Sequence, residues 1–176
     1  MVDVKNQQIQ VFDWLDKMQN TMFTKTVDWC DINTGSANLD GLLDFSKKLQ
    51  GEFLCLGNIE LIDLPDRVVI DDDGSEATYK SAPIIRFNKP QKGKPSILLV
   101  AHYDTVYAKD HAFQKCKMMP DGTLNGPGVA DLKGGMVVML YALQALKMSG
   151  LMAQVGIEVL LNPDEEIGSP VSGAYL

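Results

Sequence analysis

A histidine and an aspartate after one apolar segment are the first residues here that could do chemistry. Residues 97–101 lead directly into His102, and Asp104 stands two positions later. An uninterrupted run of branched apolar residues predicts a strand that is buried on both faces. Parallel-type sheets place their sites beyond the carboxyl ends of such strands. Residues two apart point to the same face, which suits a metal-binding imidazole oriented by a carboxylate. Alone, the pair is equally compatible with an ordinary loop.

Two further acidic clusters stand at comparable places. A glycine-rich turn contains Asp131 and leads into a run of helix-forming residues at 136–148. A second buried strand is predicted at 155–161, and the acidic segment behind it contains Glu165 and Glu166. One imidazole and several carboxylates are ligands that suit zinc or a related divalent cation. The repetition favours a metal site over three unrelated loops.

The adjacent Glu165 and Glu166 are the most specific element of this pattern. Two neighbouring carboxylates resist joint ionisation unless a cation neutralises one of them, and a base is useful beside water that a metal activates. One glutamate can therefore bind metal while its neighbour accepts a proton. By itself a Glu-Glu pair indicates a solvated loop, and the residues alone leave open which glutamate has which role.

These clusters resemble the three consecutive signatures of the co-catalytic zinc exopeptidases and deacylases. That family includes glutamate carboxypeptidase, aminoacylase, acetylornithine deacetylase and succinyl-diaminopimelate desuccinylase. Thr-Val-Tyr in the first segment and Gly-Pro-Gly-Val-Ala-Asp in the second are most similar to the glutamate carboxypeptidase branch. Asp-Ile-Asn-Thr-Gly-Ser at 31–36 is also similar to the family, and the resemblance extends from about residue 20 to the end. The three segments are His102–Tyr107, Gly126–Gly135 and Asp164–Ser169.

The resemblance implies a role for each candidate site residue. His102 would bind one metal ion, Asp131 would bridge two, and Glu166 would bind the second. Glu165 would be the general base, and Asp104 would orient His102. A cis peptide bond would directly follow Asp131. The implied cofactor is zinc, with two ions in the longer family proteins and with cobalt or manganese as alternatives.

The chain also departs from the family pattern. Family proteins supply a further carboxylate ligand and a final histidine downstream, and they insert a separate dimerisation domain. This chain ends at Leu176, and its second histidine, His111, stands in a polar segment outside the motifs. We therefore expect residues 1–176 to be the amino-terminal part of the catalytic domain, without the dimerisation (lid) domain and the carboxyl-terminal part. We expect this part to be inactive by itself.

The resemblance implies an α/β fold with a mixed, mostly parallel sheet sandwiched by helices. Hydrophobic periodicity predicts a first helix that continues to about Asp28. A second helix is predicted from an Asn38 cap through Gln50, and a last one is predicted to begin at Ser169-Pro170. Further strands are predicted at 53–61, 66–70 and 82–87.

Composition and charge describe an ordinary globular domain. The chain has 176 residues, which is long enough to bury a sizeable core, and its 45% apolar and 22% charged residues are ordinary for a soluble globular protein. The net charge of −7 argues against nucleic acid or an anionic membrane as a partner. The apolar segments are far shorter than the roughly 20 residues that span a bilayer. The acidic run at 71–73 predicts a solvated turn, with a calcium loop as the alternative.

Cysteine usage and the first residues indicate a cytoplasmic protein. The segment after Met1 offers no apolar core for a signal peptide. Cys30, Cys55 and Cys116 are an odd number without close spacing, which favours reduced thiols over disulfides. No histidine stands near them, so we do not expect a catalytic cysteine.

The resulting functional hypothesis is metal-dependent hydrolysis of an amide or peptide bond next to a free carboxylate. Glu165 would take a proton from the attacking water and return it to the leaving amine. The substrate would be a small peptide or an N-acyl amino acid, and the longer protein would be a homodimer. Three alternatives stay open. They are an N-acyl-amino-acid deacylase of the same family, an inactive metal-binding or interaction module, and an α/β domain whose acidic residues are merely surface.

Overall fold

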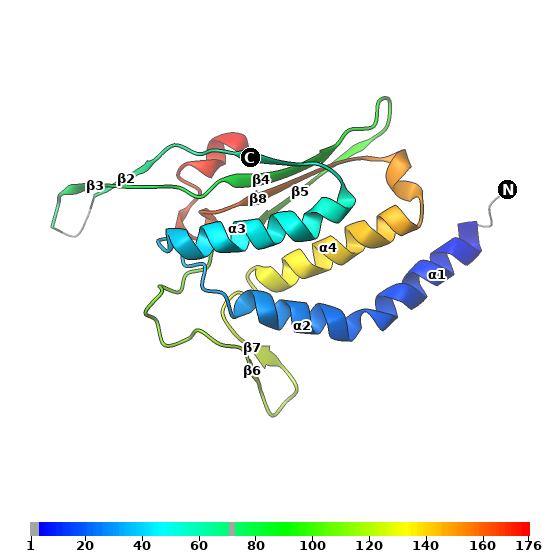
Figure 1. Cartoon of the computed structure of the whole chain (residues 1–176), viewed down its shortest axis with the longest axis horizontal. Helices are drawn as coiled ribbons and strands as arrows, with labels where there is room; N and C mark the ends of the chain where they lie inside the picture. The colour runs from blue at the N-terminus through cyan, green and yellow to red at the C-terminus, as the bar shows by residue number, and fades with distance from the viewer. Residues whose placement is uncertain (1–3, 71–72) are drawn as a thin grey trace.

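The computed structural model describes residues 4–70 and 73–176, and of residues 4–8 it describes the helical backbone alone. Its largest sheet has four strands, and the α-helices lie on one side of it (Figure 1). The α-helices are α1 (Val4–Lys17), α2 (Gln19–Cys30), α3 (Leu39–Phe53) and α4 (Lys133–Met148). The strands are β1 (Ile59–Ile62), β2 (Arg67–Ile70), β3 (Glu76–Tyr79), β4 (Ile84–Lys89), β5 (Ser96–His102), β6 (Lys117–Met118), β7 (Leu124–Asn125) and β8 (Gly156–Asn162). The described residues also contain four 3₁₀ turns: η1 (Leu54–Leu56), η2 (Leu151–Gln154), η3 (Glu165–Ile167) and η4 (Ser172–Tyr175).

The central sheet is mixed, as predicted, but most of its pairings are antiparallel. The strand order is β1-β4-β8-β5. The pairs β1–β4 and β4–β8 are antiparallel, and β5–β8 is parallel. A parallel pair needs a long crossover, which here contains α4, whereas antiparallel neighbours need none. The predicted mostly parallel sheet is therefore wrong in this respect. Among the described strands of this sheet, only β5 and β8, which end at the candidate site, are parallel neighbours.

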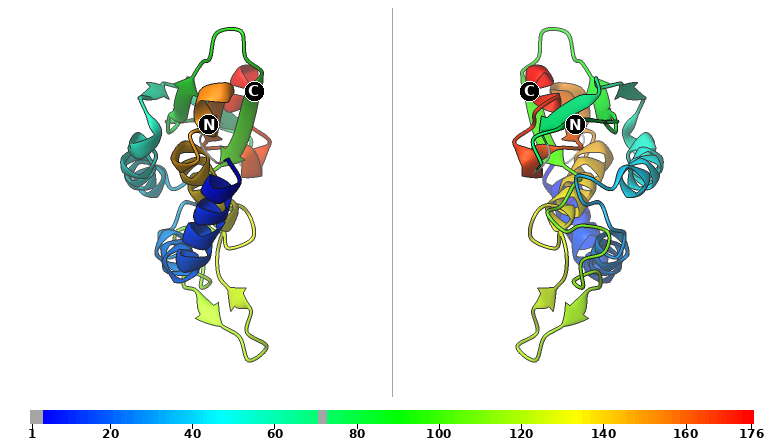
Figure 2. Two further views of the ribbon diagram at one scale, coloured as in Figure 1. Left: turned by 90° about the vertical axis from the view of Figure 1, so that its right-hand side faces the viewer. Right: turned by 90° about the vertical axis from the view of Figure 1, so that its left-hand side faces the viewer.

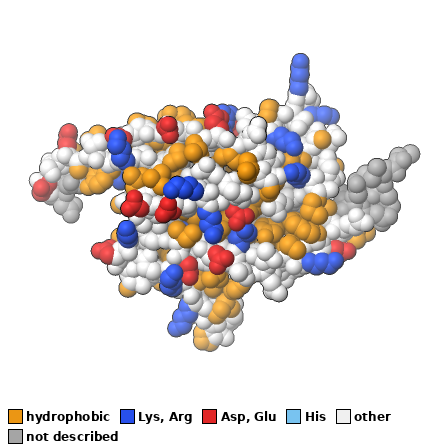
Figure 3. Space-filling view, viewed as in Figure 1, with side chains coloured by type: hydrophobic (Ala, Val, Ile, Leu, Met, Phe, Trp, Pro, Cys, Tyr) orange, Lys and Arg blue, Asp and Glu red, His pale blue; other side chains and the backbone are white. Residues whose placement is uncertain are grey.

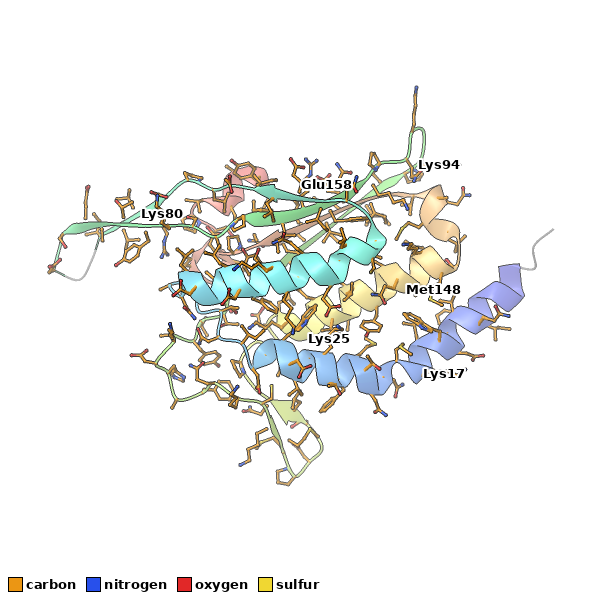
Figure 4. All side chains as sticks on the ribbon, in the orientation of Figure 1. Lys17, Lys25, Lys80, Lys94, Met148 and Glu158 are labelled. Atoms are coloured by element: carbon orange, nitrogen blue, oxygen red, sulfur yellow. The ribbon has the colours of Figure 1, made fainter. Side chains whose placement is uncertain are left out.

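The core lies between one face of the sheet and the helices α3 and α4 (Figure 1). The helices α1 and α2 pack against α4 on the side away from the sheet, so they form a further layer (Figure 2). Lys25 of α2 reaches across to Glu52 of α3 and pairs with it (Figure 4). The buried core residues include Phe45, Leu49, Ile85, Phe87, Met136, Leu140, Ile157, Val159 and Leu161.

The outer face of β5 is exposed, which corrects the prediction that this strand is buried on both faces. Leu98 is 51% exposed and Val100 is 44% exposed, although Ala101 beside them belongs to the core. β5 is an edge strand of the described sheet, and the described α-helices cover the opposite face. On the open face Arg86 of β4 pairs with Glu158 of β8 at 2.7 Å (Figure 4).

Three helix and strand predictions needed correction. The first predicted helix is two helices that meet at Met18, and both pack against α4. The predicted strand at 53–61 begins only at Ile59, because Phe53 and Leu56 are buried at helical spacing at the end of α3 and in η1. The predicted last helix is the short turn η4. Ser169 before it has a φ of 51°, which does not suit the first turn of an α-helix.

The predictions for the acidic run and for the start of the chain concern residues that lie partly outside the described ranges. Residues 71 and 72 of the acidic run lie outside them, as do residues 1–3 at the start of the chain. Within the described ranges, no helix is both long and apolar enough to cross a bilayer. Apolar side chains nevertheless gather on the surface along the junction of α1 and α4, where they line a groove (Figure 3).

Candidate metal centre

Three predicted ligands meet at the carboxyl end of the parallel strand pair. His102 ends β5 opposite Asn162, the last residue of β8, and the turn η3 with Glu166 follows shortly after. Asp131 stands just before α4. The ligand atoms of His102, Asp131 and Glu166 all lie within 4.8 Å of one another. The predicted convergence of these residues, which are far apart in the sequence, is therefore confirmed.

The parallel pairing explains why the site forms at this edge. Parallel strands end at the same edge of a sheet, so the residues after β5 and after β8 become neighbours. The crossover between the two strands returns through α4, and this helix begins at the same edge. Asp131 therefore arrives beside His102, with 2.9 Å between its Oδ1 and the imidazole Nε2.

Asp104 occupies the position from which it can orient His102. Its carboxylate is completely buried, and Oδ1 lies 3.2 Å from Nδ1 of His102. This contact leaves Nε2 facing Asp131, which is the arrangement of a metal-binding histidine held by a carboxylate. The same carboxylate also accepts hydrogen bonds from the backbone amides of Glu165 and Glu166, both at 3.1 Å. Sequence reasoning did not foresee this second contact.

The two adjacent glutamates occupy different positions. Glu166 belongs to the group of described side chains that could hold an ion together, with His102 and Asp131. Glu165 is outside that group, and its Oε2 lies 3.7 Å from Nε2 of His102. About half of the Glu165 side chain is exposed, so its carboxylate is accessible to water. The geometry thus offers one glutamate as a ligand and leaves the other beside the ion position.

The charges at the site favour a bound cation. Burial lowers the pKa of His102, but hydrogen bonds to Asp104 and Asp131 outweigh this effect and raise the pKa to about 9. Burial and the nearby charge of Asp131 raise the pKa of the Glu166 carboxyl above its ordinary value. Neighbouring carboxylates thus contribute to both shifts. One imidazole and two carboxylates within reach of one another fit a divalent cation that prefers nitrogen and oxygen ligands.

A buried lysine anchors the Asp131 loop to the end of α2 and the residues after it. Lys133 is 1% exposed, and its Nζ donates hydrogen bonds to the carbonyls of Ile32 at 2.7 Å and Trp29 at 3.2 Å. Burial lowers the pKa of Lys133 to about 8. The peptide bond between Asp131 and Leu132 is cis, as the resemblance implied. Sequence reasoning did not single out Lys133, because a lysine at the start of a helix ordinarily predicts a solvated side chain.

Several reactive side chains stay outside the site. His111 is exposed in the loop after β5, where its Nδ1 accepts a hydrogen bond from the amide of Phe113. Cys30 is buried and Cys55 is exposed, and neither belongs to the group of described residues that could hold an ion. The expectation that these residues do not take part in the site is consistent with their positions.

A cavity of about 260 Å³ opens beside the ligands. Asp131 and Glu166 form one of its walls, and the segment after Asp104 forms another. It offers room for part of a small substrate next to the position of the ion. The remaining lining residues are Thr105, Val106, Tyr107, Gly126, Gly128 and Ala130.

Comparison with known proteins relates this geometry to a family. Residues 98–176 match the family model described as Peptidase family M20/M25/M40. Carboxypeptidase G2 of Pseudomonas sp. (strain RS-16) is 32% identical over 139 residues, which are 79% of this chain and 31% of that protein. Cysteinylglycine-S-conjugate dipeptidase of Corynebacterium striatum is 34% identical over 89 residues, which are 48% of this chain and 19% of that protein. The chain thus spans less than a third of the length of these relatives.

A solved structure shares the fold. Human carnosine dipeptidase 1 superimposes with a TM-score of 0.75 over 93% of this chain and 36% of that chain, at 19% sequence identity. At this identity the likeness concerns the fold alone, and it agrees with the predicted mixed α/β class. The family match covers His102, Asp131 and Glu166 together with Asp104 and Glu165. Residues 98–176 therefore belong to peptidase family M20/M25/M40, as the three motifs predicted.

Proposed function

We propose that the protein containing these residues is a metal-dependent hydrolase that cleaves an amide or peptide bond next to a free carboxylate. The observation that carries the proposal is the group formed by His102, Asp131 and Glu166, with Glu165 beside it. The names of the relatives, a carboxypeptidase and a dipeptidase, support peptides as substrates.

The proposed cofactor is zinc, with cobalt or manganese as chemically similar alternatives. His102 would hold one ion, Asp131 would bridge two, and Glu166 would hold the second. When bound, such a cation polarises the scissile carbonyl and lowers the pKa of water at the site. The side-chain set supports this assignment because it combines one imidazole with two carboxylates whose ligand atoms lie close together.

Glu165 is the proposed general base and acid. Its carboxylate is accessible and lies within reach of the ion position, so it can take a proton from the attacking water. The same carboxyl group would then deliver that proton to the leaving amine. Asp104 would keep the imidazole of His102 directed at the ion throughout, because its carboxylate lies against Nδ1.

Metal titration and a substrate panel test this proposal. We expect the purified chain to take up zinc, and we expect His102→Ala to abolish the uptake. In the native protein that contains residues 1–176, we expect hydrolysis of peptides with a free terminal carboxylate and little hydrolysis of the same peptides as amides. A preference for N-acyl amino acids would identify the deacylase alternative. Zinc uptake that His102→Ala leaves unchanged, or hydrolysis that resists chelators, would contradict the proposal.

The remaining expectations are part of the same proposal. A cytoplasmic location and a homodimeric native protein follow from the cysteine usage and from the resemblance, respectively. Neither nucleic acid nor a membrane is proposed as a partner, because the net charge is −7. Sedimentation of the native protein would measure its oligomeric state directly.

A further inference from the structure

The carboxylate of Asp104 is a buried charge with donors at both of its oxygens. Oδ1 faces Nδ1 of His102 at 3.2 Å and accepts from the amide of Glu165 at 3.1 Å. Oδ2 accepts from the amide of Glu166 at 3.1 Å and from the hydroxyl of Ser36 at 2.8 Å. A buried carboxylate is costly unless its oxygens are satisfied. These four contacts therefore explain how the charge is held at the centre of the site.

Two of these contacts make Asp104 a cap for the turn η3. The first amides of a helical turn find no partner within the turn itself. Asp164, which precedes η3, makes no side-chain bond to it, and its Oδ2 accepts instead from the amides of Val171 and Ser172. Asp104 takes the place of this local cap. It thereby ties the turn that carries both glutamates to the strand that carries His102.

Ser36 is the partner of Asp104 that comes from outside the three motifs. It lies in the connection between α2 and α3, and the backbone holds this connection against the segment that follows Asp104. The amide of Ser36 donates to the carbonyl of Thr105 at 3.2 Å, and the amide of Thr105 donates to the carbonyl of Thr34 at 2.9 Å. Gly35 forms a parallel bridge with Thr105. The backbone thus delivers the Ser36 hydroxyl to Oδ2.

We propose that Ser36 is a positioning residue that acts through Asp104 to hold the turn η3, and with it Glu166, in place for the metal. The hydroxyl of Ser36 and the amide of Glu166 share Oδ2, whereas the contacts of His102 and Glu165 use Oδ1. Loss of the hydroxyl leaves Oδ2 with one of its two partners and lets the carboxylate rotate. The effect should therefore fall more on Glu166 than on His102. This role rests on the proposed metal-dependent function.

The first test needs no metal. Threonine and valine at position 36 have the same shape but differ in the hydroxyl, and Ser36 lines a small cavity. We expect the Glu166 amide of Ser36→Val to exchange with deuterium about 5-fold faster than that of Ser36→Thr, as judged by NMR. The change at Glu165 should be smaller. Ser81→Ala is the matched control, because Ser81 lines the same cavity but donates to the carbonyl of Pro65.

The second test uses zinc as the probe on the same variants of the whole chain. We expect calorimetric titration to show about 10-fold weaker binding for Ser36→Val, the effect of losing a supporting partner. Ser36→Thr and Ser81→Ala should bind as the wild type does. Equal exchange at Glu166 in the valine and threonine variants, with a general loss of thermal stability, would overturn the role of Ser36.

The two measurements separate this role from the proposed function. If the native protein that contains residues 1–176 takes up no zinc, but the Glu166 amide still exchanges faster in the valine variant, the positioning role stands and the metal-dependent function fails. If the wild type binds zinc and the valine and threonine variants behave alike in both measurements, the function stands and the role of Ser36 fails.

Discussion

At the scale of single residues, the carboxylates of the site differ in burial and in hydrogen bonding. Asp104 is fully buried, and its carboxylate accepts hydrogen bonds from backbone amides. Asp131 and Glu166 place their carboxylates near the imidazole of His102, and both residues are more exposed than His102. Glu165 is accessible beside them. Chemically similar side chains can therefore serve as orienting group, ligands and base, because burial and hydrogen bonding differ at each position.

The adjacent glutamates give the first prediction. Glu165→Gln should reduce hydrolysis by about 10²- to 10⁴-fold, because an amide cannot accept the proton, while the bound metal is retained. Glu166→Gln should lose metal, because a neutral amide is a weaker ligand for a divalent cation. Metal content and turnover are measured on both variants of the native protein. Metal lost from the Glu165 variant and kept in the Glu166 variant would reverse the two roles.

The thiols give a second prediction at this scale. Cys30 is completely buried, and burial raises its pKa to about 12, so hardly any thiolate is present below pH 10. Cys55 is exposed. We expect iodoacetamide at pH 8 to modify Cys55 in the folded chain and to leave Cys30 intact, as read by peptide mass spectrometry. Urea should make both react. Rapid native modification of Cys30 would show that α2 opens there readily.

At the scale of elements, short connections fix the ends of the helices near the site. Asn38 caps α3 by accepting from the amide of Gly41 at 3.3 Å, as the sequence predicted. Its Nδ2 also donates to the backbone carbonyl of Asn33 at 3.1 Å. Asn33 in turn donates to the carbonyl of Tyr107 at 3.0 Å. The connection between α2 and α3 therefore links a helix start to the loop that follows the first motif.

Removing this cap gives the third prediction. Asn38→Ala should lower the free energy of unfolding by about 1 to 2 kcal/mol, because it removes the cap of α3 together with the bond to Asn33. Urea unfolding followed by circular dichroism measures the change. Asn20→Ala within α2 is the control, and it should change the stability by less than about 0.5 kcal/mol. Equal effects of the two substitutions would mean that the cap contributes nothing specific.

At the scale of the whole molecule, apolar surface remains uncovered on one side of the sheet. The exposed face of the edge strand β5 carries Leu98 and Val100. Edge strands present unpaired backbone groups, and exposed apolar side chains next to them favour association between molecules. Both features occur on the same strand, so this edge is the place where copies of the chain should meet.

Association through β5 gives the fourth prediction. We expect sedimentation velocity to show that the purified chain forms oligomers as its concentration rises, and Val100→Lys should shift it toward the monomer. A charge at an exposed position of an edge strand opposes pairing between strands. Val68→Lys is the control, because Val68 is 61% exposed on the separate hairpin of β2 and β3. A monomer at all concentrations would refute the prediction.

The sequence by itself determined the chemistry of the site and the local elements that bear it. The three clusters were found because imidazole and carboxylate groups follow strand and turn signals, and the family resemblance then singled out His102, Asp131 and Glu166 as the candidate ligands. The cap at Asn38 and the helix α4 were also predicted, since both depend on residues close together in the chain.

The tertiary structure alone decided what depends on contacts distant in sequence. It placed Ser36 on Asp104, buried the lysine at position 133 beneath the Asp131 loop, and left Leu98 and Val100 exposed. An apolar run does not reveal whether a strand is central or at an edge, because that depends on which strands pair with it. A hydroxyl or an ammonium group likewise finds its partner only when segments from different parts of the chain come together. For this reason, the candidate ligands and Asp104 could be named from the sequence, whereas the supporting contacts of Ser36 and Lys133 could not.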